Sequence, residues 1–187
     1  MCLRLLVHRF FKMKMIKTRC SNSKQSGFTL LEILIAVLVL SIGLLGLAAL
    51  QLTGLKHNQS SQYRSMATTL AYDMADRIRA NKTAEQAGDY AIAFGTAPSG
   101  SATNCSLSAC ATDAMATYDM AYWKCSLGNW NNETICGTTG TNLAIKGDLP
   151  SGDGLISKTG DIYTISVRWD DNRSGSADTT FSMRFRP

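Results

Sequence analysis

The sequence contains few of the residues that catalytic and metal centres need. It has two histidines in 187 residues, and only His57 follows the long apolar run. Ser60 and Ser61 lie near His57, but their three- and four-residue spacing is ordinary on a helix, and no suitable carboxylate or nucleophile elbow completes a triad. The sequence also contains no phosphate-cradling glycine loop and no metal-binding cluster. We therefore expect neither enzyme activity nor a cofactor.

Acidic residues are absent from the first 27 positions, which carry seven lysines and arginines. The remaining residues carry 12 basic and 14 acidic side chains, a net charge of −2, so the formal charge of +5 belongs to the N-terminal segment. A body without net positive charge argues against a nucleic-acid-binding domain. We interpret residues 1–27 as a basic leader, with Met13 and Met15 as alternative start positions, and expect no nucleic acid among the partners.

Polar residues are almost absent from Ile33 to Leu50, where Ser41, Gly43 and Gly46 alone interrupt 18 positions. That length fits a transmembrane helix at the short end of the range. Because the basic residues precede the run, the N-terminus is expected to stay in the cytoplasm and the remainder to be exported.

Two other export signals lack a feature that they require. No A-x-A cleavage site follows the apolar core, as a secretory signal peptide needs, and no cysteine follows it directly, as a lipoprotein signal needs. An ordinary single-pass anchor fits the length. It explains neither Gly27 nor Glu32, a carboxylate that is costly in lipid.

Proline is also scarce, with three in the chain and none between Thr53 and Lys82. Apolar side chains recur over this stretch at three-, four- and eight-residue intervals: Leu55, Tyr63, Met66, Leu70, Met74 and Ile78. We predict one helix from Phe28 to about Asn81, roughly 80 Å long at 1.5 Å per residue. Its first half is apolar all round, and its second half is amphipathic, which indicates packing against a sheet.

The C-terminal residues alternate as β-strands do. Apolar and polar side chains take turns over residues 161–169 and again over residues 178–186, with the turn-rich DDNRSGSA between them. These segments predict an antiparallel hairpin whose apolar face packs on the amphipathic half of the long helix. The intervening chain shows weaker patterns: a loop at 83–111, a helix from Thr112 to about Trp130 capped by Thr112 or Asp113, turns at 131–154 and a strand at Leu155–Lys158.

Six cysteines are present, two of them, Cys2 and Cys20, in the leader. The other four follow the apolar run: Cys105, Cys110, Cys125 and Cys136. In an exported segment they can form disulfides with three possible connectivities. The short spacings favour Cys105–Cys110 and Cys125–Cys136, whereas the same spacings match zinc sites poorly.

Two surface hypotheses arise from the hairpin. Arg168, Arg184 and Arg186 could touch DNA or a surface polymer, but a solvated basic face that balances nearby aspartates is the favoured interpretation. Residues 170–172, Asp-Asp-Asn, could bind calcium, yet they lack the spaced oxygen ligands of a dedicated loop.

The segment GFTLLEILIAVLVLSIGLL, which begins at Gly27, resembles the N-terminus of type IV pilin precursors. In that family a basic leader ends in glycine, methionine or phenylalanine follows, and glutamate stands five residues in. Gly27, Phe28 and Glu32 occupy these positions. The resemblance implies an α+β type IV pilin fold, in which a long N-terminal helix packs on a C-terminal antiparallel sheet and its apolar half lies in the membrane or the filament core.

Four further blocks resemble the PilV branch, the minor pilins called type IV pilus modification proteins: SIGLLGLAALQL, AYDMADRIRANK, YDMAYWK and YTISVRWDDN. Major pilins commonly have a proline where this chain has Ala49, so a weaker helix kink is expected. Cys125, inside YWKCSL, departs from the family pattern and leaves the partner of Cys136 open. The resemblance implies four segments: a cleaved leader at 1–27, a transmembrane or filament-core helix at 28–52, its amphipathic half at 53–82 and a globular α+β head at 83–187.

The resemblance also implies a processing pathway. A prepilin peptidase cuts between Gly27 and Phe28, and the new Phe28 amine is N-methylated, so this chain is a substrate and not an enzyme. A glycine before the cut lets the backbone lie extended in a narrow cleft, because no Cβ obstructs it. Glu32 is then expected to pair with the Phe28 amine of a neighbouring subunit. Alternatively, Glu32 only favours the helix start through the macrodipole.

The implied function is that of a minor pilin in the priming and assembly of the type IV pilus, within a minor-pilin complex at or near the tip. Expected partners are the prepilin peptidase, other minor pilins and the major pilin, a PilY-type tip adhesin, the inner-membrane assembly platform and the lipid bilayer. The chain is expected in the inner membrane with a periplasmic head, and then in the pilus. The alternative is a pseudopilin of a type II secretion system, which shares the same N-terminus.

Overall fold

The computed structural model describes residues 27–100, 102–137 and 143–187. Residues 1–26, which hold almost all of the predicted leader, lie outside the described residues. The chain forms two compact units, one up to Leu47 and one from Ala48 to Pro187, here called the C-terminal unit.

The long helix predicted from the sequence is confirmed as α1, Leu30–Ala80, a helix of 51 residues. It begins two residues later than predicted and ends at Ala80, before Asn81. The Asn81 side chain accepts a hydrogen bond from the Ala84 N–H at 3.4 Å and so caps the short helix α2, Lys82–Ala87. The expected loop at 83–111 is therefore wrong at its start, because this cap nucleates one more helical turn.

Three strands form an antiparallel sheet in the order β1–β2–β3: β1 at Asp153–Thr159, β2 at Ile162–Trp169 and β3 at Thr179–Phe185. In the central strand, Ile165 pairs with Ile156 on one side and Met183 on the other. The predicted hairpin of β2 and β3 is thus confirmed. The strand expected at Leu155–Lys158 is β1, which pairs with β2 as the third strand of the sheet.

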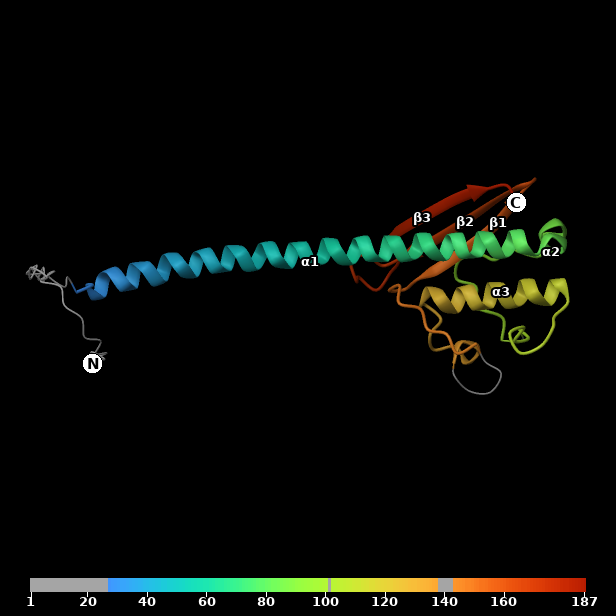
Figure 1. Cartoon of the computed structure of the whole chain (residues 1–187), viewed down its shortest axis with the longest axis horizontal. Helices are drawn as coiled ribbons and strands as arrows, with labels where there is room; N and C mark the ends of the chain where they lie inside the picture. Colours follow the sequence, from blue (N-terminus) through green and yellow to red (C-terminus); the bar gives the residue numbers. More distant parts are fainter. Residues whose placement is uncertain (1–26, 101, 138–142) are drawn as a thin grey trace, which may run out of the picture. The chain divides into compact units, whose positions relative to one another are not determined.

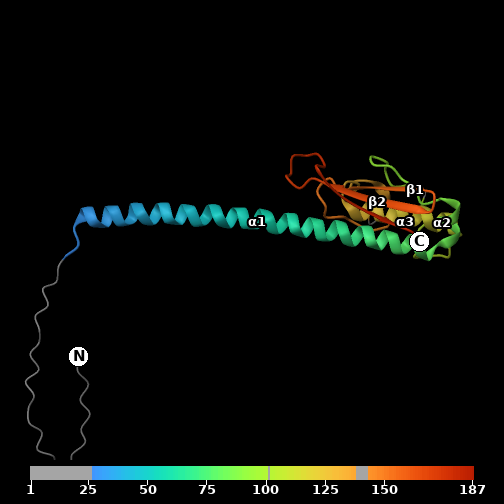
Figure 2. The same ribbon diagram turned by 90° about the horizontal axis from the view of Figure 1, so that it is seen from above.

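The sheet and the helix α3, Thr112–Leu127, both lie alongside the C-terminal half of α1 (Figures 1 and 2). A single core joins the three elements, and the sheet gives it Tyr163, Ile165, Val167 and Trp169. From α1 come five fully buried residues, three of them alanines: Ala67, Ala71, Met74, Ala75 and Ile78. Small side chains let a helix approach its neighbours closely, and these alanines had not entered the apolar pattern. Leu55, which had, is 61% exposed.

Helix α3 is tied to α1 by its largest side chain. The Trp123 indole N–H donates to the Leu70 carbonyl oxygen at 3.0 Å, and Trp123 is fully buried. The predicted cap is wrong, because Ala111 is the N-cap and Thr112 is already the first helical residue. Ala111 provides no side-chain oxygen, so this end of α3 has no side-chain cap.

Candidate processing and assembly site

Gly27 and Phe28 precede the first turn of α1 and lie in non-helical chain. A Cβ placed on Gly27 would meet no atom of this chain within 4 Å, and Phe28 is 77% exposed. The bond between them is therefore sterically open and not held in helical hydrogen bonding. Such exposed, non-helical backbone is what a protease needs in order to bind a substrate in extended form.

Thr29 caps α1. Its hydroxyl oxygen accepts a hydrogen bond from the Glu32 N–H at 3.2 Å, and its carbonyl oxygen accepts one from the Ile33 N–H at 3.3 Å. Glu32 thus occupies the third position of the helix, where its negative charge favours the N-terminal end of the helix dipole. Thr29 was not among the residues predicted from the sequence, although the Thr-x-x-Glu spacing is a known capping signal.

The surface that follows Glu32 is apolar. Every Leu, Ile and Val side chain from Leu30 to Leu55 is between 50% and 91% exposed. This segment of α1 is long and apolar enough to cross a membrane. So large an apolar surface requires cover, by lipid or by other protein. Glu32 is the only charged residue between Phe28 and Leu55, so it is a single carboxylate within an otherwise uncharged surface.

The polar hydroxyls within the apolar segment are satisfied by the helix itself. Ser41 donates to the Val37 carbonyl oxygen at 2.6 Å, and Thr53 donates to the Ala49 carbonyl oxygen at 3.0 Å. A hydroxyl bonded in this way can enter lipid without an unpaired donor.

Two disulfides lie in the C-terminal unit. Cys105 is bonded to Cys110 with a Cα–Cα distance of 5.6 Å, and Cys125 to Cys136 with 5.4 Å. These are the pairs that the short spacings favour. Cys125 and Cys136 are fully buried in a second small core, next to the short 3-10 helix η1, Thr134–Cys136. That disulfide therefore fastens the chain after α3 to the helix, while the other closes a loop near the surface.

Two family models match adjacent parts of the chain. Residues 22–48 match the prokaryotic N-terminal methylation motif, and residues 49–121 match a family described as type IV pilin Tt1218. Over residues 22–121 the chain is therefore similar to type IV pilins. Type IV pilins are not an enzyme family, and the methylation motif marks the type of protein that prepilin peptidases process. No curated protein and no solved structure gives a significant match to the chain.

The pilin's apolar helix and methylation motif together indicate membrane anchoring and incorporation into a pilus. The motif covers Gly27, Phe28 and Glu32; Glu32 lies in the first turn of α1, and Gly27 and Phe28 lie just before the helix. The two disulfides belong to the other unit, the C-terminal one.

A first, partly buried polar network joins α1 to α3 in the pilin. The Arg77 guanidinium contacts the carboxylates of Asp73 and Asp119, each at 2.9 Å. The fully buried Tyr90 hydroxyl donates to Asp119 at 2.7 Å, and the Asn81 amide donates to the Tyr90 oxygen at 3.2 Å. The carboxylate of Asp119 is thereby satisfied from two sides.

A second network lies around Asp153 at the start of β1. Its carboxylate accepts from Lys124 at 2.6 Å, from Arg168 at 3.0 Å and from the Gly95 N–H at 2.7 Å. Burial opposes the negative charge, but Lys124 and the backbone N–H groups of Gly95 and Gly154 hold the pKa of Asp153 below its usual value. The Arg168 guanidinium also lies over the Phe94 ring, 4.3 Å from its centroid. Arg168 is therefore not part of a free basic face with Arg184 and Arg186.

The residues of the calcium and enzyme hypotheses make other contacts in the structure. Asp170 is 2% exposed, and its carboxylate accepts hydrogen bonds from the N–H groups of Ser174 and Gly175 at 2.9 and 2.6 Å. It therefore organises the β2–β3 loop. Among the described residues, no three metal-ligating side chains come together. Ser60 donates to Asp171 at 2.7 Å instead of pairing with His57.

Proposed function

We propose that this pilin is a minor pilin that primes assembly of the type IV pilus, in a complex with other minor pilins and a PilY-type adhesin near the tip. The observation that carries this proposal is that the PilV-like blocks supply residues to both polar networks of the C-terminal unit. AYDMADRIRANK supplies Asp73, Arg77 and Asn81 to the first network, and YDMAYWK supplies Asp119. Lys124, from YDMAYWK, and Arg168, from YTISVRWDDN, meet at Asp153 in the second.

These blocks therefore carry the polar residues that determine how α1, α3 and the sheet fit together. A resemblance confined to the apolar helix would suit any pilin. A resemblance in the buried polar contacts of the C-terminal unit is more specific, because each partner must match the others in position and charge.

Processing between Gly27 and Phe28 is part of the proposal. The structure leaves this bond exposed and ahead of the helix, and the methylation motif covers it. Cleavage creates a positive amine on Phe28, next to the N-terminal end of a helix whose dipole disfavours positive charge. The Glu32 carboxylate compensates that charge, because it lies in the first helical turn.

In the filament, we expect Glu32 to pair with the Phe28 amine of a neighbouring subunit. A charged residue at mid-helix costs about 2.5–3.5 kcal/mol to place in lipid, and less near a helix end. Pairing between subunits offsets this cost only when their axial register is correct. The dipole contribution of Glu32, typically about 0.3–1 kcal/mol, operates whether or not a neighbour is present.

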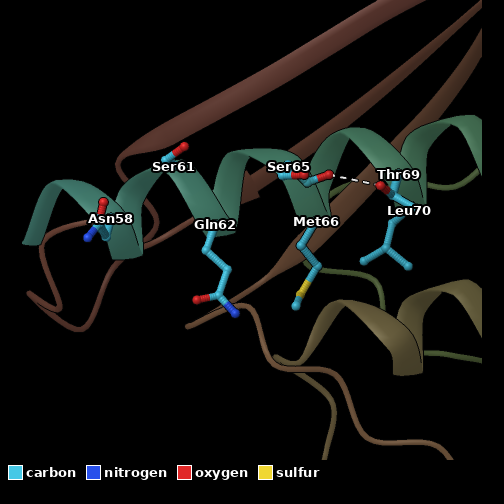
Figure 3. Close-up of a pocket in the computed structure, with 7 residues that line it drawn as sticks. All are labelled: Asn58, Ser61, Gln62, Ser65, Met66, Thr69 and Leu70. Atoms are coloured by element: carbon cyan, nitrogen blue, oxygen red, sulfur yellow. Dashed lines mark hydrogen bonds between the residues drawn. The ribbon is translucent and has the colours of Figure 1, made fainter. Parts of the chain in front are cut away.

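The α1 surface between Asn58 and Leu70 supports packing against other subunits. It lines a shallow hollow of about 590 Å³ (Figure 3), in which Gln62, Met66 and Leu70 point toward the side of α3. Ser61 and Ser65 are exposed on the same helix. This face belongs to the C-terminal unit, and its hollow leaves room for side chains of a neighbouring subunit.

The second candidate is a pseudopilin of a type II secretion system, because such proteins share the N-terminal motif. An in-frame deletion of the gene separates the two functions. A priming minor pilin predicts a loss of surface pili that the intact gene restores, with secretion unaffected. Pili at wild-type number together with a loss of protein secretion would favour the pseudopilin.

A further inference from the structure

A pocket of about 390 Å³ lies where α1 meets the β2–β3 loop. Lys56, His57 and Ser60 of α1 line one wall, and Asp171, Asn172 and Arg173 of the loop line the other. Neither the pilin motif nor the two polar networks uses this pocket.

Hydrogen bonds hold the loop on the helix. The Ser60 hydroxyl donates to one carboxylate oxygen of Asp171 at 2.7 Å, and the Trp169 indole N–H donates to the other at 3.2 Å. The Arg173 guanidinium donates to the Tyr63 hydroxyl at 3.3 Å. Arg173 has a φ of 55°, a left-handed conformation that is uncommon for a residue with a side chain. The fold thus places Arg173 in the lining of the same pocket as Lys56.

The charges in the pocket favour an anion. Lys56 and Arg173 are cations, and His57 adds a nitrogen donor. The Asn172 amide already donates one hydrogen bond, to the Asp178 carboxylate. Asp171 is the one carboxylate in the lining, and both of its oxygens already accept hydrogen bonds from Ser60 and Trp169. An anion with several oxygens, such as a phosphate diester, could therefore bind the two cations.

The position of the pocket along the chain identifies the source of that phosphate. The apolar surface of α1 runs from Ile33 to Leu55, about 34 Å at 1.5 Å per residue, which matches a hydrocarbon core of about 30 Å. Lys56 and His57 are the next two residues. While the segment spans the bilayer, they lie at the level of the lipid headgroups on the exported side.

We propose that this pocket binds the phosphate of an anionic phospholipid headgroup while the pilin is held in the membrane. The bound headgroup fixes the depth and rotation of the subunit before it enters a filament, and it is left behind on extraction. The proposal rests on membrane anchoring of α1. It does not depend on a minor-pilin role.

Photocrosslinking tests the proposal on the full chain, reconstituted in nanodiscs of zwitterionic phosphatidylcholine. The probe is a phosphatidylglycerol analogue with a photoreactive headgroup, and the labelled peptides are mapped by mass spectrometry. We expect labels on the segments that contain Lys56 and Arg173. Each basic residue near a lipid surface strengthens the binding of anionic lipid roughly five-fold. The double variant Lys56→Gln with Arg173→Gln should therefore reduce this labelling by at least about ten-fold.

The matched control removes two exposed arginines from the same unit, Arg184→Gln with Arg186→Gln, and should leave the labelling unchanged. Tryptophan fluorescence of each variant verifies folding. Unchanged labelling in the Lys56/Arg173 variant, equal loss in the control, or equal labelling by a phosphatidylcholine analogue would overturn the proposal. So would displacement of the probe by millimolar inorganic phosphate, which would indicate a general anion site. Pilus counts test the proposed function separately, so the two can fail independently.

Discussion

The ammonium of Lys124 lies 2.6 Å from the carboxylate of Asp153, and neither side chain is more than 2% exposed. This pair connects α3 to the first residue of β1, and Arg168 of β2 joins it on the same carboxylate. Charges so deeply buried are stable only while each has its partner, because the uncompensated charge left behind is costly.

Replacing Lys124 with methionine should therefore lower the free energy of unfolding by about 3 kcal/mol or more. Asp153→Asn should have a comparable effect, and the double variant should cost less than the two single variants combined, since the residues are in direct contact. Thermal unfolding of the full chain in detergent, followed by tryptophan fluorescence, measures these differences, because all three tryptophans lie in the C-terminal unit. Lys146→Met, at an exposed position, is the control and should change little.

Tyr90 makes stability sensitive to alkaline pH. Burial, together with the hydrogen bond to Asp119, raises the pKa of Tyr90 well above its usual value of about 10. Above pH 10 the unfolded chain therefore loses this proton while the folded chain keeps it, so the free energy of unfolding falls as pH rises. In urea titrations between pH 9 and 11, Tyr90→Phe should show a smaller decline than the parent. An identical decline in both would contradict this assignment; Tyr72→Phe, at an exposed position, is the control.

Gly154 is required by the packing of α3 on β1. A Cβ at this position would overlap the ring of Trp123 and lie 2.7 Å from Leu127 Cδ1. Overpacking of a close-packed core costs typically about 1–3 kcal/mol, so Gly154→Ala should destabilise the C-terminal unit by at least that amount. Gly100→Ala is the matched control, since a Cβ there meets nothing within 4 Å. Equal melting temperatures for the two variants would rule out this close contact.

The elements with strong local patterns were predictable from the sequence. The absence of proline and the apolar stripe predicted α1, and strict alternation predicted β2 and β3. The polar networks were not predictable, because their partners lie far apart in the chain. Lys124 and Asp153 are 29 residues apart, and Ser60 and Asp171 are 111 residues apart. Charged residues are normally assigned to the surface, so no local signal indicated that Asp119 and Lys124 are buried.

The N-terminal site depended on a different kind of signal. Gly27, Phe28 and Glu32 were identified by resemblance to a motif, since nothing in their local physics distinguishes a cut site from a helix start. Thr29 was missed, although its spacing from Glu32 is visible in the sequence. In the structure, Thr29 and Glu32 have different roles: Thr29 caps the start of the helix, and Glu32 places a negative charge in its first turn.

Substitutions at these two positions should therefore differ in outcome. Glu32→Ala should leave leader cleavage largely intact but reduce incorporation into pili, because the carboxylate has its proposed partner only in the assembled filament. Thr29→Ala removes the cap, which costs typically about 1 kcal/mol of helix stability, and frays the first turn. Thr29→Ser retains a hydroxyl and is the control. Immunoblots of membrane and sheared-pilus fractions measure leader cleavage and incorporation into pili. Normal incorporation of Glu32→Ala would refute the pairing role.

The most direct test of the account is intact-mass and N-terminal peptide mass spectrometry of the protein extracted from membranes. The account predicts a chain that begins at Phe28 with one methyl group on its amine. A Gly27→Leu variant should retain its leader, because a bulky side chain would obstruct the peptidase cleft. A wild-type chain with any N-terminus other than Phe28 would contradict the central claim.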